Sequence, residues 1–137
     1  MRFEGQVRKE GRFWLAAVPA FDALTQGRTK AEALAMIKDL IETMAGAREF
    51  EVTVYPTESR EFEIGANDLG ILLALLLRRQ RERQGLTLAE AAQRLGQTSR
   101  NAYARYEQGK AMPTLEKLEQ LLRAIAPGQR IVWRFAA

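Results

Sequence analysis

The sequence contains neither cysteine nor histidine among its 137 residues. It therefore has no disulfide, no zinc site with thiolate or imidazole ligands, and no nucleophile that is activated by histidine. The catalytic alternative that remains is metal-dependent phosphodiester cleavage, which needs several converging carboxylates. Asp22 and Asp39 are the only aspartates before Asp68. We therefore expect no enzyme activity, no metal and no cofactor.

Long hydrophobic runs are also absent. The longest apolar run, Ile71 to Leu77, is far shorter than the roughly 20 residues that cross a membrane, and the N-terminal residues do not resemble a signal sequence. These features predict a cytoplasmic protein with no membrane partner. A composition that is 47% hydrophobic and 28% charged is typical of a folded globular chain, here one domain or two small ones.

Charge is unevenly distributed along the chain. Residues 1–68 contain 9 basic and 12 acidic residues, whereas residues 69–137 contain 12 basic and 5 acidic residues. This asymmetry indicates two modules, of which the basic rear one is the candidate for binding a phosphate backbone. The alternative is chance clustering of solvated charges.

The pattern of residues 1–67 predicts a small antiparallel sheet with one helix. Two strand-like runs, Phe3 to Lys9 and Arg12 to Val18, form a predicted hairpin. Thr29 and Glu32 make a capping box for a helix that ends at Gly46. Alternating residues predict two further strands, at 50–54 and 61–64. This half of the chain is therefore an α+β module.

Residues 68–137 are predicted to be helical. Asp68 caps a helix from Leu69 to Gln84 that is apolar nearly all round in its first half, so it must be buried on more than one side. Two short helices follow, from Thr87 to Gly96 and from about Ser99 to Glu107, and a last helix begins at Pro113-Thr114. Two short helices around a glycine-containing turn are typical of a helix-turn-helix, whose second helix enters the major groove. The alternative is a plain helical bundle.

The second short helix and its surroundings carry the side chains suited to DNA. Arg100 can pair with a guanine edge and Asn101 with an adenine edge. Hydroxyl, amide and ammonium groups nearby can hold phosphates. The predicted DNA-binding residues are Thr87, Gln97, Thr98, Ser99, Arg100, Asn101, Arg105 and Lys110.

After Pro127-Gly128, the alternation of Ile131, Trp133 and Phe135 predicts a short C-terminal strand. An isolated strand is marginal, so we expect it to pair with the same strand of a second subunit, in a homodimer or a higher homo-oligomer. Such a dimer places two recognition helices about 34 Å apart and predicts a palindromic operator. The alternative is that the tail packs on its own module.

The segments GLTLAEAAQRLG, ARYEQGK and PTLEKLEQLL, within residues 77–125, resemble a Cro-type helix-turn-helix, and SRNAYARYEQGKAMPTLEKLEQLL is similar to the form in HicB antitoxins. FWLAAVPAFDALTQGRTKAEALAMIKDLIETM resembles the HicB-type domain, with its Thr-x-Gly turn at Thr25 to Gly27. Together the two resemblances cover nearly the whole chain.

The resemblance implies a type II antitoxin whose front domain neutralises a HicA-type RNA-cleaving toxin and whose rear domain represses the operon. A protein that grips RNA is usually basic, which makes an acidic surface its natural complement. The candidate toxin-binding residues are Trp14, Glu49, Glu51, Glu61 and Glu63. A core role for Trp14 and a merely solvated sheet face for the glutamates are the alternatives. The alternative function is a stand-alone DNA-binding regulator whose front domain senses a small ligand or another protein.

Overall fold

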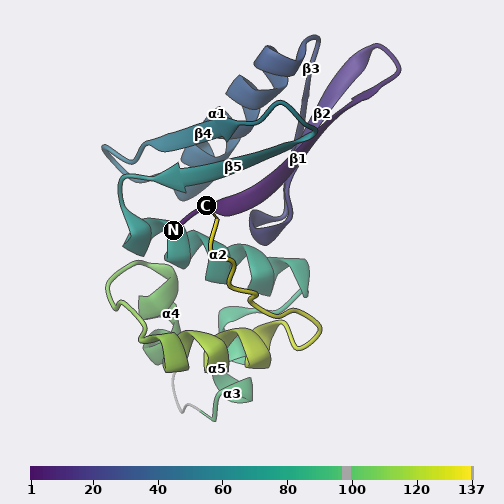
Figure 1. The fold of residues 1–137 in the computed structure, drawn as a ribbon. Helices are drawn as coiled ribbons and strands as arrows, with labels where there is room; N and C mark the ends of the chain where they lie inside the picture. The colour runs from purple at the N-terminus through teal and green to yellow at the C-terminus, as the bar shows by residue number, and fades with distance from the viewer. Residues whose placement is uncertain (97–99, 137) are drawn as a thin grey trace.

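The computed structural model describes residues 1–96 and 100–136, which form a sheet module stacked on a helical module (Figure 1). The described part of the sheet module has five strands in the order β3-β2-β1-β5-β4, with every neighbouring pair antiparallel. Its elements are β1 (Phe3–Glu10), β2 (Phe13–Val18), the 3-10 turn η1 (Pro19–Phe21), β3 (Ala23–Gly27), α1 (Lys30–Ala45), β4 (Val52–Pro56) and β5 (Glu61–Ala66). The predicted α+β class is confirmed.

The sheet has one face covered by α1 and one face left open. On the covered face, Val7, Ala16 and Ile64 are fully buried, because alternate residues of each strand point to the same side. The residues between them point to the open face, where Glu4 lies opposite Glu63 across the β1–β5 ladder. Both faces of the sheet are therefore fixed by the register of the strands.

Strand β3 was not expected from the sequence. Thr25 to Gly27 was predicted as a turn, but these residues lie in β3 and pair with β2, with Trp14 opposite Gly27. The segment lacks an alternating pattern, so its strand conformation comes from pairing with β2. Gly27 is needed there because a Cβ atom would lie 2.5 Å from the backbone nitrogen of Ala33 in α1.

The helical module consists of α2 (Leu69–Arg83), α3 (Leu88–Arg94), α4 (Arg100–Glu107) and α5 (Leu115–Ile125). Side-chain caps confirm the predicted starts of α2, α3 and α5, whereas the predicted start of α4 at about Ser99 lies outside the described residues. Asp68 accepts a hydrogen bond from Ile71 N at 3.0 Å, and Thr87 accepts one from Glu90 N at 3.1 Å. Thr114 caps α5 in the same way. Thr29 likewise caps α1, where its hydroxyl accepts a hydrogen bond from Glu32 N at 3.0 Å.

Helix α2 lies between the two modules (Figure 1) and packs against both. Every residue from Leu72 to Leu77 is buried, with η1 and α1 on one side of the helix and α4 and α5 on the other. Arg79 Nε donates to the Phe21 carbonyl at 2.9 Å, and Gln80 Nε2 donates to the Ala20 carbonyl at 2.8 Å. The predicted division at 67/68 assigns α2 to the rear module, although its contacts join the cores of both.

The predicted C-terminal strand is not formed in this chain. Residues 126–136 have no strand or helix assignment, because no neighbouring strand of the same chain offers them a ladder. Instead the tail returns to the sheet module (Figure 1), where Arg134 pairs with Glu4 and with Glu63. Trp133 stays 58% exposed, and Phe135 is fully exposed.

Candidate nucleic-acid interface

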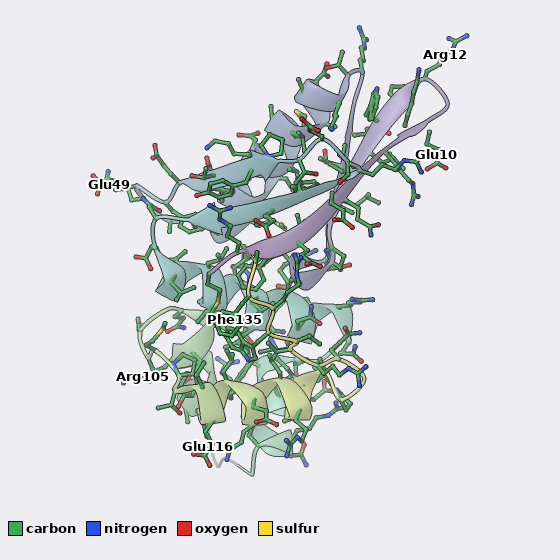
Figure 2. The ribbon with its side chains drawn as sticks, in the orientation of Figure 1. Glu10, Arg12, Glu49, Arg105, Glu116 and Phe135 are labelled. Carbon is green, nitrogen blue, oxygen red and sulfur yellow. The ribbon has the colours of Figure 1, made fainter. Side chains whose placement is uncertain are left out.

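Helix α4 is built to present one side outward. Tyr103 and Ala104 are buried, and the helix packs on α2 and α3. Asn101 and Arg105, one helical turn apart, are exposed on the side away from these buried residues. Arg100 is exposed at the first residue of the helix. Figure 2 shows Arg105 at the outer surface of the helical module.

The charge of the surface around α4 depends on the positions of the few acidic residues in the helical module. Glu82 pairs with Arg79, and Glu107 pairs with Arg81, so these two carboxylates neutralise cations of α2 rather than cations of α4. Within residues 69–96 and 100–136, seven cations make no ion pair: Arg83, Arg94, Arg100, Arg105, Lys110, Lys117 and Arg130. Those in α4 and the turn after it leave this part of the surface positively charged.

A buried ion pair fixes the end of α4. Arg81 Nε lies 2.7 Å from Glu107 Oε2, Arg81 Nη2 lies 2.9 Å from Glu107 Oε1, and Arg81 Nη1 donates to the Leu86 carbonyl at 2.7 Å. The hydrogen bond with Glu107 raises the pKa of Arg81, and burial raises the pKa of the adjacent Tyr103 hydroxyl. Sequence analysis missed this pair because no local pattern links residues 26 positions apart.

The structure places the other predicted DNA-binding residues as follows. Gln97, Thr98 and Ser99 lie outside the described residues. The Thr87 hydroxyl caps α3 and also donates to Glu90 Oε1 at 3.0 Å, so it is already engaged. Lys110 is exposed in the turn after α4. The exposed charged groups on or beside α4 are those of Arg100, Arg105 and Lys110, and Asn101 is an exposed amide of the same helix.

The predicted toxin-binding residues do not form one surface. Glu61 and Glu63 share the open face of the sheet with Glu4, and Glu63 pairs with Arg2 at 3.1 Å. The guanidinium of Arg2 stacks on the Tyr55 ring, 3.4 Å from its centroid. Glu49 and Glu51 lie in the segment before β4, and Figure 2 shows Glu49 at its outer end. Trp14 is on the opposite face of the sheet, half-buried beside the core.

Residues 72–127 match the family model of a helix-turn-helix domain. This part of the chain is a helix-turn-helix domain. The match begins inside α2 and extends beyond α5, so it includes all the exposed cations of α4, and it confirms the helix-turn-helix prediction. No curated protein matches the chain. Among residues 1–96 and 100–136, no helix has the length and apolar character to cross a membrane.

Proposed function

We propose that the protein is the antitoxin of a type II toxin-antitoxin system. Its helix-turn-helix domain represses the operon, and its front module neutralises a HicA-type RNA-cleaving toxin. The observation that carries the proposal is a helix-turn-helix domain joined through α2 to a module with an open, carboxylate-lined sheet face. The resemblance of the front module to HicB-type domains supplies the identity of the partner.

The DNA half of the proposal rests on α4. Asn101 and Arg105 project from its outer side and are placed to meet base edges or phosphates in the major groove. Lys110, just beyond the helix, is suited to a phosphate. A homodimer presents two such helices about 34 Å apart, so the proposed operator is palindromic.

The toxin half of the proposal rests on the open face of β1 and β5. Glu4, Glu61 and Glu63 project from neighbouring strands of this face. Glu61 makes no ion pair among the described residues, whereas Glu4 pairs with Arg134 and Glu63 pairs with Arg2 and Arg134. A basic RNA-binding protein complements these carboxylates by taking the place of the two arginines. Trp14 lies on the other face and is not part of this proposed surface.

Co-expression with a HicA-type toxin tests the antitoxin function. We expect the full chain to restore growth and to co-purify with the toxin, and we expect Glu61→Lys with Glu63→Lys to abolish both. The control, Glu32→Lys with Asp39→Lys, makes the same charge change on exposed positions of α1, beyond the covered face of the sheet. Full toxicity in the presence of the folded parent chain rejects the antitoxin function and leaves a DNA-binding regulator whose front module senses another molecule.

A further inference from the structure

The front module also has a positively charged cleft, in contrast to the carboxylates on its open face. On the covered side of the sheet, a cleft lies between the β1–β2 hairpin, the start of α1 and the loop from β4 to β5. We call it the basic cleft, and its charged and aromatic lining residues are Arg8, Lys9, Trp14, Lys30, Glu58 and Arg60. Of the four cations, Lys9, Lys30 and Arg60 make no ion pair among the described residues, whereas Arg8 alternates onto the other face of β1 and pairs with Glu10 at 3.3 Å. Three unpaired cations thus lie beside one carboxylate within a module that is acidic overall.

The cleft exists because the hairpin extends past the helix. Figure 1 shows the β1–β2 hairpin projecting from the sheet, and Glu10 and Arg12 mark its tip in Figure 2. Lys9 is paired with Trp14 in the β1–β2 register, so both side chains lie on the same face. On the other side of Trp14 the register partner is Gly27, which has no side chain to cover the indole ring.

The walls of the cleft hold their cations in place through backbone contacts. Lys30 Nζ donates to the carbonyls of Thr57 and Ser59 at 3.4 and 3.2 Å, which ties the first residue of α1 to the β4–β5 loop. The Arg60 carbonyl accepts a hydrogen bond from Val7 N at 2.8 Å, which anchors the other end of that loop to β1. Among the described residues, Lys9, Lys30 and Arg60 make no ion pair, so their charges are not neutralised by a carboxylate of the chain.

We propose that the basic cleft binds single-stranded nucleic acid, with one base stacked on the Trp14 ring and the flanking phosphates held by Lys9, Lys30 and Arg60. Cations around an aromatic platform are the combination that single-strand binders use, because stacking accepts any base and the cations follow the backbone. A duplex hides the faces of its bases, so the cleft does not suit it. The site is separate from α4 and does not depend on which protein the front module binds.

Fluorescence anisotropy with a labelled oligouridylate of about twelve nucleotides tests the site in the full-length protein at low salt. We expect Lys9→Ala with Arg60→Ala to weaken binding about tenfold or more, and Trp14→Leu to weaken it similarly while Trp14→Phe retains most of it. The matched control, Arg28→Ala with Arg48→Ala, removes two exposed cations of the same module outside the cleft and leaves binding within about twofold.

A second readout separates the cleft from the DNA-binding helix. In a Trp133→Phe background Trp14 is the only tryptophan, so its fluorescence is quenched when a base stacks on it. We expect Arg100→Ala with Arg105→Ala to reduce duplex binding but to leave oligouridylate affinity and quenching unchanged. The proposal is overturned if the oligouridylate does not bind, or if it binds without quenching Trp14 fluorescence. It is also overturned if Arg100→Ala with Arg105→Ala lowers the affinity for oligouridylate as much as Lys9→Ala with Arg60→Ala does. An equally labelled oligothymidylate shows whether the 2′-hydroxyl contributes.

Discussion

Arg81 in α2 and Glu107 at the end of α4 form a two-pronged ion pair across the helix-turn-helix domain, with N–O distances of 2.7 and 2.9 Å. The two side chains are only 12% and 5% exposed. Because α2 also donates hydrogen bonds to the carbonyls of η1, the same helix holds the end of α4 and the front module. Helix α2 therefore ties the position of α4 to the sheet module.

Glu107→Gln is expected to destabilise the protein by about 3–5 kcal/mol, because it leaves the buried Arg81 guanidinium with no charged partner nearer than Glu82, whose carboxylate is 4.0 Å away. Urea unfolding followed by circular dichroism measures the change. Glu119→Gln is the control: its pair with Arg123 is about 70% exposed (72% for Arg123 and 69% for Glu119), and its loss costs about 0–1 kcal/mol. Equal destabilisation by both variants contradicts a structural role specific to the buried pair.

Gly27→Ala is expected to destabilise the front module by roughly 1–3 kcal/mol or more, since the added methyl group meets backbone rather than a movable side chain. Thermal unfolding measures the effect. The same substitution at Gly128 is the control, because a Cβ there has no neighbour within 4 Å. If Gly27→Ala is as stable as the parent protein, the prediction is wrong, and β3 and α1 can move apart with little loss of stability.

Local signals in the sequence were enough for the helices, whereas features that depend on distant partners were not. Thr29, Asp68 and Thr87 cap helices where predicted, because a cap involves only the next three residues. Strand β3 and the tail at 131–135 both depend on a neighbouring strand: β3 has β2 beside it, but the tail has none in this chain. The opposite sides taken by Trp14 and Glu63 likewise follow from register and not from composition.

Glu42 is expected to make stability depend on pH. The hydrogen bond from Lys38, assisted by one from Val52 N at 3.0 Å, lowers the pKa of Glu42 below its ordinary value of 4.5, against the opposing effect of burial. A lowered pKa in the folded state means that the stabilisation is complete above pH 4.5 and is lost as the pH falls through the folded value. Glu42→Gln is therefore less stable than the parent at pH 7, and the difference disappears in acid.

Urea midpoints between pH 7 and pH 3 measure this difference. Asp39→Asn, which removes an exposed carboxylate from the same helix, controls for the change in net charge. A constant difference between parent and Glu42→Gln across the whole range contradicts the assignment to Glu42.

Substitutions on and beside α4 are expected to separate base contacts from phosphate contacts. Arg100→Ala should relax sequence preference at one base pair, at a cost of about 1–3 kcal/mol on the preferred sequence. Lys110→Ala should weaken binding to all duplexes and reduce the slope of log affinity against log salt by about 0.9, the value for one phosphate. Selection from a random duplex library, followed by salt titrations, measures both. If both variants keep the sequence preference and the salt dependence of the parent protein, Arg100 and Lys110 do not contact DNA.

The tail is expected to hold two copies of the chain together. Ile131, Trp133 and Phe135 are 41%, 58% and 103% exposed in the single chain, although burial of such side chains contributes about 1.5–3 kcal/mol each. Pairing with the same segment of a second copy supplies both the missing ladder and the missing apolar contacts.

Sedimentation of the full chain and of a chain ending at Gly128 tests this role, and we expect the shortened chain to be monomeric. Arg134→Ala is a second variant, which removes the ion pairs of the tail but keeps its apolar residues. Arg134 pairs with Glu4 and Glu63 of its own sheet and so tethers the tail without burying the aromatic residues. If apolar pairing drives association, Arg134→Ala frees the tail and the variant still dimerises, whereas Trp133→Ser with Phe135→Ser does not. An unchanged dimer after removal of the whole tail means that the subunits meet elsewhere, and the half-site spacing of the operator then has to be set by that other interface.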